Sequence, residues 1–356
     1  MWVQGPSPCG SRGRSRGASR SRSRHSPDGI VLTRLDAVPR TKLASVPTPL
    51  IAVPSLAAHL DTGARIFVKA DDRTGLGLGG NKVRKLEYEL APERLAGVTE
   101  LVTAGGPHSN HCRVVAAAAA QLGLRCTLVI NGEAEDPARG NAHLHRLLGA
   151  RIVTVPERDD RDPAMEEEAR RVGAAGGRAL VVPVGASTPR GALGYVHAAA
   201  EMHRQLDSRT RVWIFVSTSS GGTLGGLILG CALLDWPVRL VGVSADEPAA
   251  LTKDKAVGLA LDAARLLGHE GLADSVRALS DSVVTTDAFV GEGYGAATPA
   301  GDEAARVFGA RTGLILDPVY TAKAAAAMIA WLRRGRIPAS DRVIFVHTGG
   351  HPALFR

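Results

Sequence analysis

Short β-branched runs alternate with longer alanine-rich stretches from about residue 50 onward. The runs predict strands, and the stretches show apolar residues at the spacing typical of helices. We expect strands at 65–69, 101–103, 127–130, 151–155, 179–183, 212–216, 239–243 and 343–347. We expect helices at 83–96, 110–123, 139–148, 164–176, 191–206, 223–234, 299–312 and 319–334. This alternation predicts βαβ units around mainly parallel sheets, and therefore an α/β fold.

The ends of the predicted strands are the places to look for a ligand site. In open α/β sheets, free backbone amides and helix dipoles point to the region where strands end and helices begin. Polar, glycine-rich strand exits occur at 103–111, 184–191, 217–226 and 347–352.

The amino-acid composition also supports the α/β fold class. A chain of 356 residues with 45% apolar content can bury a large core, in two globular units or in one unit that carries an insertion. The 41 glycines and the 4% aromatic content suit close packing of helices on a sheet better than an all-β sandwich. The longest apolar stretch, 114–120, is too short to span a membrane.

The net charge of +8 is concentrated at the N-terminus. Residues 1–30 contain six arginines and a single acid, Asp28, which gives this segment a charge of +5. Within it, residues 10–27 alternate Ser, Arg and Gly with almost no apolar residue, so we expect 1–34 to be a disordered basic tail. A transit peptide, a start codon assigned too far upstream and a nucleic-acid arm all stay open for it. The remainder is nearly balanced in charge, which argues against nucleic acid as a partner.

Cysteines indicate neither a disulfide framework nor a zinc site. The four, at positions 9, 112, 126 and 231, form no CxxC pair and accompany no histidine cluster at metal-ligand spacing. We therefore predict no metal, and the pattern fits a reducing cytoplasm.

A candidate nucleophile lies in GLGLGGNKVRKLE, residues 75–87. Lys82 follows small and polar residues at a predicted helix start, where a partly desolvated amine can lose its proton, form an imine with an aldehyde cofactor and act as a base at Cα. An ordinary surface lysine is the alternative when this motif is considered alone.

Two further motifs connect a predicted strand to a predicted helix. VSTSSGGTLGGL, residues 216–227, offers N–H groups and hydroxyls that suit a phosphate dianion, but lacks the GxxxxGK[ST] pattern of nucleotide sites. TAGGPHSNHCR, residues 103–113, places Ser109 and Asn110 where they can cap a helix and bind a carboxylate and a phenolic oxygen.

Together these motifs resemble one family, the pyridoxal-phosphate enzymes with the tryptophan synthase β-like fold, in the branch of D-cysteine desulfhydrase and 1-aminocyclopropane-1-carboxylate (ACC) deaminase. The resemblance covers most of the chain. It rests on PTPL (47–50), KADDRTG (69–75), GGNKVRKLE (79–87), SNHCR (109–113), GALGYVHAAAEM (191–202), GEGYG (291–295), LDPVYTAKA (316–324) and HTGGHPALF (347–355).

The resemblance implies a role for each matching residue. Lys82 would hold pyridoxal 5′-phosphate as a Schiff base, and Asn110 would bond the 3′ oxygen of the cofactor. Ser109 would contact the substrate carboxylate and could assist proton transfer. Tyr294 and Tyr320 would face the substrate. The phosphate would lie in the loop formed by Ser219, Ser220, Gly221, Gly222 and Thr223.

Two threonines favour one branch of this family. The resemblance implies that Thr348 meets the pyridine nitrogen, and that Thr321 stands where ACC deaminases have a glutamate. A neutral pair resembles the desulfhydrase type, because a carboxylate beside the pyridine nitrogen strengthens the electron sink that ring opening needs. ACC deaminase and L-cysteate sulfo-lyase stay open as alternative activities, and a non-catalytic pyridoxal-phosphate carrier as an alternative class.

The resemblance therefore predicts pyridoxal-phosphate fold type II, with two open, twisted, mainly parallel sheets flanked by helices. We expect a large domain of residues 35–84 and 196–356, a smaller α/β domain inserted at 85–195, and the cofactor between them. The expected protein is a cytoplasmic homodimer that acts on a small amino acid and binds neither nucleic acid nor membrane. The expected reaction is α,β-elimination of D-cysteine to pyruvate, ammonia and hydrogen sulfide.

Overall fold

The fold is that of a computed structural model, which describes residues 35, 37–132, 136–206, 210–268 and 271–355. The whole predicted tail, residues 1–34 with Cys9, lies outside the described residues, so the disorder prediction stays a prediction. Cys112, Cys126 and Cys231 are buried free thiols. Among the described residues, no helix has the length and apolar character needed to cross a membrane.

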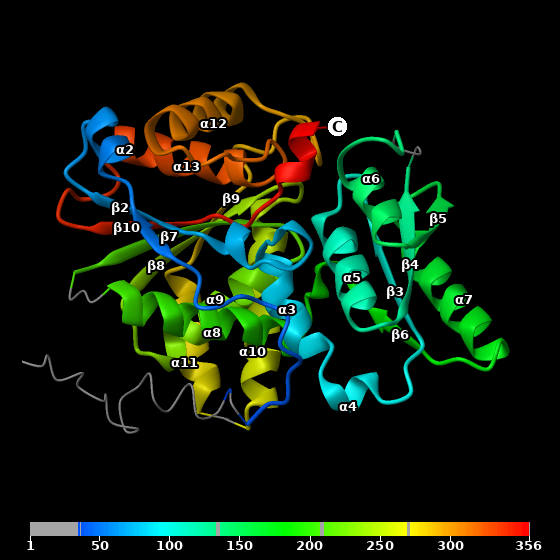
Figure 1. Cartoon of the computed structure of the whole chain (residues 1–356). Helices are drawn as coiled ribbons and strands as arrows, with labels where there is room; N and C mark the ends of the chain where they lie inside the picture. Colours follow the sequence, from blue (N-terminus) through cyan, green and yellow to red (C-terminus); the bar gives the residue numbers. More distant parts are fainter. Residues whose placement is uncertain (1–34, 36, 133–135, 207–209, 269–270, 356) are drawn as a thin grey trace, which may run out of the picture.

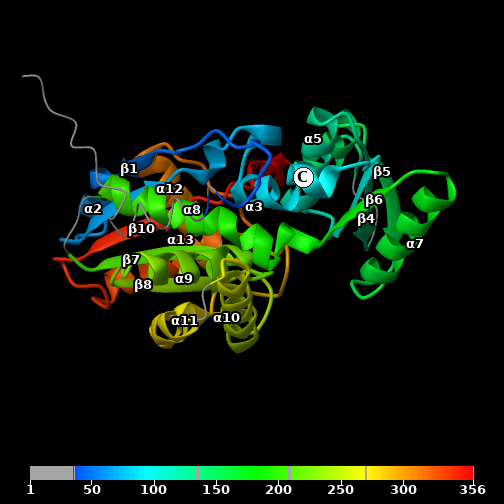
Figure 2. The ribbon, with the colours of Figure 1, turned by 90° about the horizontal axis from the view of Figure 1, so that it is seen from below.

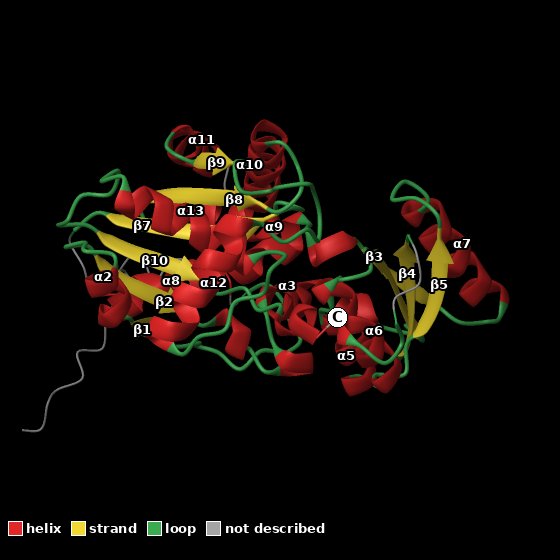
Figure 3. Ribbon diagram, turned by 90° about the horizontal axis from the view of Figure 1, so that it is seen from above, coloured by secondary structure: helices red, strands yellow, loops and turns green. Residues whose placement is uncertain are grey.

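Two separate sheets form the frame, as predicted, and they stand apart with helices between them (Figure 3). The larger sheet is parallel except at one edge, where β1 pairs antiparallel with β2. Its strands, in spatial order, are β1 (Leu50–Ala52), β2 (Arg65–Lys69), β10 (Arg342–Val346), β7 (Val212–Thr218), β8 (Val238–Ser244) and β9 (Val284–Thr286).

The smaller sheet is entirely parallel. Its strands, in spatial order, are β5 (Arg151–Val155), β4 (Arg125–Asn131), β3 (Glu100–Gly105) and β6 (Ala179–Val182). All of them lie within the predicted inserted segment 85–195, but its first boundary falls inside helix α3 (Asn81–Glu89). The domain boundaries stay a prediction.

Helices cover both faces of the larger sheet (Figure 1). One face is packed by α2 (Pro54–His59), α12 (Pro299–Thr312) and α13 (Thr321–Arg333). The other is packed by α8 (Pro189–Leu206), α9 (Gly222–Leu233), α10 (Ala249–Leu266) and α11 (Leu272–Asp281). Glycine allows α9 to approach α8 closely, because a Cβ at Gly226 would lie 2.2 Å from the carbonyl oxygen of Ala192.

The smaller sheet is also flanked on both sides. Helix α5 (Asn110–Gln121) packs on one face with α3, and α7 (Arg161–Ala174) on the other. The short helices α4 (Pro92–Leu95) and α6 (Gly140–Leu147) complete this part. The C-terminal 3₁₀ turn, His351–Phe355, contacts α6 and so joins the two parts. Figure 2 shows the C-terminus where the two parts of the molecule meet.

A buried ion network fixes α3 to the larger sheet and to α8. Arg84 donates from Nε to Asp71 Oδ2 at 2.9 Å and from Nη2 to Glu201 Oε2 at 2.8 Å. Lys69 donates to the same Glu201 oxygen at 2.8 Å, and the Tyr195 hydroxyl donates to Asp71 at 2.6 Å. Each charge of this network therefore has an opposite charge in contact, which offsets the cost of its burial.

Candidate active site

A cavity of about 190 Å³ lies where strands of both sheets end. Its walls include residues from all four strand exits that the sequence predicted as ligand-binding places, so the fold brings these exits together. That they bind a ligand stays a prediction. The predicted site residues that line it are Lys82, Ser109, Ser219, Ser220, Gly221, Gly222, Thr223, Tyr294, Tyr320 and Thr348.

Two predicted site residues, Asn110 and Thr321, do not line the cavity. Both are buried and bonded to other side chains. Asn110 Oδ1 accepts a hydrogen bond from Asn141 Nδ2 at 3.2 Å, and the Thr321 hydroxyl donates to Asp317 Oδ1 at 2.6 Å. Their proposed contacts with the cofactor ring stay predictions.

Lys82 is positioned by the turn before helix α3. Gly80, the residue before the helix, has φ = +117°, a conformation that side chains with a Cβ rarely adopt. The backbone N–H of Asn81 donates to the carbonyl of Thr348 at 3.1 Å, and its side chain donates to Thr223 Oγ1 at 2.9 Å. Lys82 is thereby held between the exits of β10 and β7.

The amine of Lys82 is suited to nucleophilic chemistry. Burial lowers the pKa of Lys82 to about 8, although the negative charge of Asp317 acts in the opposite direction. Its Nζ lies 5.0 Å from the centre of the Tyr320 ring. A substantial fraction of this amine is therefore neutral near pH 8, as attack on an aldehyde requires.

Asp317 is a buried residue of this site that sequence reasoning did not single out. Its Oδ2 accepts hydrogen bonds from the backbone N–H groups of Val319 and Tyr320, each at 2.9 Å. Its Oδ1 accepts the backbone N–H of Thr321, also at 2.9 Å. These bonds hold a negative charge near Lys82 and orient the turn that presents Tyr320.

Tyr294 and Tyr320 meet on one wall of the cavity. Their hydroxyl oxygens are 2.8 Å apart, and their rings pack edge to face. Burial raises the pKa of Tyr294 to about 12 and that of Tyr320 well above its ordinary value. Both hydroxyls are therefore protonated at neutral pH and can donate a proton or a hydrogen bond.

Another part of the cavity forms a cradle for a dianion. It contains the N-terminus of α9, where the Gly222 N–H donates to Ser187 Oγ at 3.2 Å. Ser187 and Ser220 hydroxyls lie 2.7 Å apart, and Lys85 Nζ reaches Ser187 at 3.2 Å. Burial, and then the charge of Lys82, lower the pKa of Lys85 well below its ordinary value, so a phosphate dianion beside it would favour its charged form. Helix amides, hydroxyls and lysine amines are groups that bind phosphate. The sequence motif identified the loop, but Lys85 and Ser187 were missed because they come from other elements.

Ser109 caps helix α5, as predicted. Its side chain accepts a hydrogen bond from the Cys112 N–H at 3.2 Å. His111, two residues further along, also lines the cavity, and its Nε2 lies 2.8 Å from Thr103 Oγ1. Burial lowers the pKa of His111 well below its ordinary value, so this ring is neutral.

The remaining wall is charged and was not predicted. It includes Arg158, Arg161, Asn131 and Asp246. Arg158 belongs to the smaller part of the molecule and pairs at 3.2 Å with Asp246, which follows β8 of the larger sheet. Such pairs depend on the tertiary fold and leave no local pattern in the sequence.

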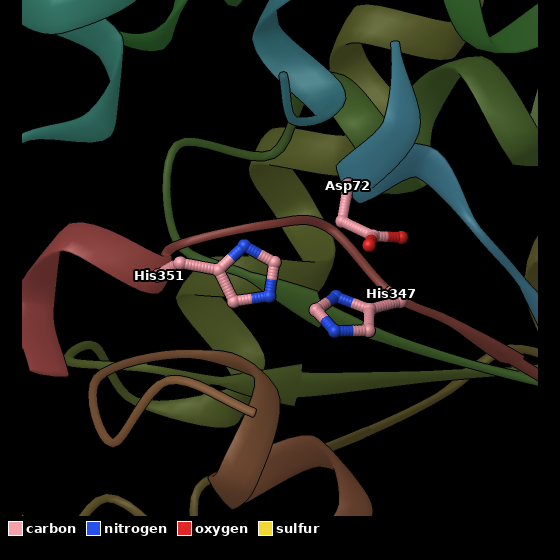
Figure 4. A group of neighbouring side chains, drawn as sticks. All are labelled: Asp72, His347 and His351. Atoms are coloured by element: carbon pink, nitrogen blue, oxygen red, sulfur yellow. The ribbon is translucent and has the colours of Figure 1, made fainter. Parts of the chain in front are cut away.

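Asp72, His347 and His351 form a cluster of potential metal ligands, in which Asp72 lies far from the two histidines in the sequence (Figure 4). Both histidines point Nε2 at the carbonyl oxygen of Ile315, at 2.9 and 3.0 Å. Asp72 Oδ1 is buried and has no hydrogen-bond partner among the described residues. The two Nε2 atoms are thus satisfied by Ile315, and the expected absence of a metal stays a prediction.

The residues of the cavity fit pyridoxal phosphate. Lys82 offers an amine with a lowered pKa for the aldehyde, and the α9 loop with Lys85 offers a site for the phosphate dianion. Thr348 offers a hydroxyl on the wall next to the start of α3.

Comparisons with known proteins agree with this fit. The chain is 36% identical to D-cysteine desulfhydrase of Salmonella newport over 330 residues, 91% of this chain and 98% of the relative. D-cysteine desulfhydrase of Klebsiella pneumoniae is equally similar. A solved ACC deaminase homologue superposes with a TM-score of 0.80 at 33% identity, covering 91% of this chain and 96% of the homologue.

More distant structures share the fold. The processed form of threonine deaminase isoform 2 from Solanum lycopersicum has a TM-score of 0.62 at 18% identity, covering 91% of this chain and 84% of its own. The predicted fold type II is thereby confirmed. The family profile described as pyridoxal-phosphate dependent enzyme matches residues 41–349. The chain belongs to the family of pyridoxal-phosphate dependent enzymes.

Proposed function

We propose that this enzyme is a carbon–sulfur lyase that converts D-cysteine to pyruvate, ammonia and hydrogen sulfide by α,β-elimination. The observation that carries the proposal is the 36% identity to D-cysteine desulfhydrase across 98% of that relative. The cavity supports it through Thr348, because a neutral hydroxyl at the pyridine nitrogen is sufficient for loss of a good leaving group.

Lys82 is the residue we assign to attachment of the cofactor and to removal of the Cα proton. When bound, pyridoxal phosphate supplies a sink for the electron pair that the Cα–H bond leaves behind. Lys82 accepts the proton at Nζ, for which its lowered pKa makes the neutral amine available. The Cβ–S bond then breaks, its electron pair leaves with sulfur as hydrosulfide, and the released enamine hydrolyses to pyruvate and ammonia.

The other side chains bind and orient. We assign the phosphate to the 219–223 loop with Lys85, the pyridine nitrogen to Thr348 and Thr321, and the 3′ oxygen to Asn110. Ser109 and the first turn of α5 bind the substrate carboxylate, since helix N-termini attract anions.

Tyr294 and Tyr320 stay protonated and donate hydrogen bonds to the departing group. Their hydroxyls therefore stabilise the negative charge that develops on sulfur as the Cβ–S bond breaks.

ACC deaminase is the second candidate, favoured by the structural similarity to an ACC deaminase homologue. Incubation of the purified protein with D-cysteine, L-cysteine, L-cysteate, D-serine and ACC, followed by assay of the 2-oxo acid, separates these activities. We expect sulfide and pyruvate from D-cysteine and little 2-oxobutanoate from ACC. Efficient ACC turnover with D-cysteine inert would overturn the proposal, and inertness towards all five would favour the non-catalytic alternative.

We also propose that the enzyme is a cytoplasmic homodimer. Light scattering on the eluting peak of a size-exclusion column measures the molar mass, which we expect to be twice the 37.1 kDa of the chain. A mass equal to that of one chain contradicts the dimer.

A further inference from the structure

The cluster of Asp72, His347 and His351 lies outside the cavity, where three segments of the larger part meet (Figure 4). Asp72 belongs to a 3₁₀ turn just after β2, His347 directly follows β10, and His351 begins the C-terminal turn. One ring nitrogen of each histidine and one carboxylate oxygen of Asp72 lie within 4.8 Å of one another. Three potential ligand atoms therefore surround one point.

The backbone holds the two histidine rings in place. Gly349 and Gly350 have φ = +85° and +113°, and they turn the chain so that His351 returns beside His347, with the ring centres 5.3 Å apart. Each ring points Nε2 at the carbonyl oxygen of Ile315, at 2.9 and 3.0 Å. Because both rings are already oriented, gathering them around an ion costs less entropy.

The carboxylate of Asp72 has no such partner. Its Oδ1 is buried and makes no hydrogen bond among the described residues, and its Oδ2 lies 4.0 Å from Arg73 Nε. The Ile315 carbonyl accounts for the histidine nitrogens, but a carbonyl has no proton to donate to a carboxylate. A buried carboxylate oxygen without a partner is costly, and a bound cation removes that cost.

We propose that Asp72, His347 and His351 bind a divalent transition-metal ion such as Zn²⁺. Two imidazoles and a carboxylate are ligands that zinc takes in proteins, and they leave a fourth position for water or a carbonyl oxygen. Ligand atoms of tetrahedral zinc lie about 3.4 Å apart, so the three groups have to close by up to about 1.4 Å. Rotation of His351, which is partly exposed, allows this closure and gives the ion a path of entry.

The ion ties separate segments of the fold together. It joins the turn after β2 to the C-terminal turn, which in turn contacts α6 of the smaller part. Since no ligand lines the cavity, the ion acts on the fold and not on the substrate. The site departs from the sequence-based expectation of no metal, because Asp72 is brought to the histidines only by the pairing of β2 with β10.

The first test measures metal binding directly. Untagged, chelator-treated holoenzyme is dialysed to equilibrium against Zn²⁺, and the bound metal is measured by mass spectrometry. We expect one zinc ion per chain in the wild type. His351→Gln and Asp72→Asn should each weaken the affinity by at least about a hundredfold, since loss of a group that only orients a ligand already costs tenfold to a hundredfold.

His59→Gln is the matched control, because His59 is an exposed histidine on α2, and it should bind zinc as the wild type does. A wild type that binds no zinc, or equal affinity in all four proteins, would overturn the inference.

The second test asks whether the ion binds the folded chain at this place. Thermal unfolding of the holoenzyme is followed by circular dichroism with and without Zn²⁺. At a hundredfold excess over the dissociation constant, Zn²⁺ should raise the melting temperature of the wild type and of His59→Gln by roughly 3–4 °C, and that of His351→Gln hardly at all. A melting temperature that Zn²⁺ leaves unchanged in the wild type, or raises equally in His351→Gln, would contradict the site. Neither test depends on the identity of the substrate.

Discussion

Two groups of buried or partly buried cations in this enzyme differ in how their charge is balanced. Around Arg84, the cations contact Asp71 and Glu201 at 2.8–2.9 Å. In the cavity, Lys82, Lys85 and Arg161 have no carboxylate oxygen within 4.0 Å among the described residues. A buried charge without a partner is costly, so it needs either backbone carbonyls, as at Lys323, or a ligand of opposite charge. We therefore expect the first region to hold the fold together and the second to bind ligands.

Replacement of Lys82, which lies in the cavity, should have the largest effect on cofactor binding and turnover. Lys82→Ala should remove covalently bound cofactor and lower turnover by more than about a thousandfold, because the variant lacks the nucleophile and the base. Mass spectrometry of the borohydride-reduced protein measures the attachment. Lys85, one turn further along α3, is the rival attachment point. If Lys82→Ala kept the covalent cofactor and Lys85→Ala lost it, the assignment would be wrong.

Replacements in the ion network around Arg84 should instead lower the stability of the fold. Arg84→Met leaves Asp71 and Glu201 without their main partner and should lower the free energy of unfolding by about 3–5 kcal/mol. Urea unfolding measures the change. Arg170→Met is the matched control, because its exposed pair with Glu167 contributes at most about 1 kcal/mol. Similar losses in both variants would contradict the structural role of the network.

Lys85 should affect ligand binding rather than folding. Lys85→Met should weaken the affinity for pyridoxal phosphate by roughly tenfold to a hundredfold, since a charged hydrogen bond to the phosphate is lost. Equilibrium titration of the cofactor-free protein gives the constant, and Lys253→Met on α10 is the control. An unchanged affinity would exclude Lys85 from the phosphate site.

A smaller effect is expected on the pH at which the cofactor attaches to Lys82. Burial lowers the pKa of Lys82 from 10.5 to about 8. The rate of attachment should therefore rise with pH, and the midpoint of that rise should lie near pH 8. Asp317 favours the charged amine, and Asp317→Asn should therefore move the midpoint to lower pH. Stopped-flow absorbance measures both. A midpoint near 10.5 would mean that Lys82 is not desolvated.

The positive charge of the N-terminal segment should have almost no effect on turnover or on the melting temperature. Deletion of residues 1–30 removes +5 of charge but no predicted core residue, so turnover and melting temperature should stay the same. A clear fall in melting temperature would show that this segment contributes to the fold.

The sequence predicted those helices and strands whose own residues show a clear hydrophobic periodicity. The strands expected at 65–69 and 151–155 and the helix at 299–312 have those bounds in the structure. The helix expected at 83–96 is instead two helices, α3 and α4, because Pro92 cannot continue a helical hydrogen-bond ladder. Proline was visible in the sequence and should have split this prediction.

Other elements had too little pattern to be found. Strands β1 and β9 have three residues each, too few for an alternation, and α2 is a short helix that was also missed. Neither α10 nor α11 was predicted. Helix α10 buries alanines and one threonine, which give a weak hydrophobic signal.

Family motifs identified the centre of the site but not all of its walls. Lys82 and the 219–223 loop line the cavity as expected. The sequence could not show that Thr321 turns towards Asp317, because that direction depends on packing at the start of α13. Nor could it pair Asn131 with Arg161, which lie on different elements of the smaller part.

The order of strands in the larger sheet has a consequence for synthesis of the protein. β10 is the last strand along the chain, yet it lies between β2 and β7, in register with both. A ribosome releases β2 and β7 long before the strand that must separate them. The nascent chain therefore has two unsatisfied strand edges that could pair wrongly with each other or with other chains. Truncation before residue 342 would remove the middle of the sheet, so such a product should be recovered as aggregate rather than as a smaller enzyme.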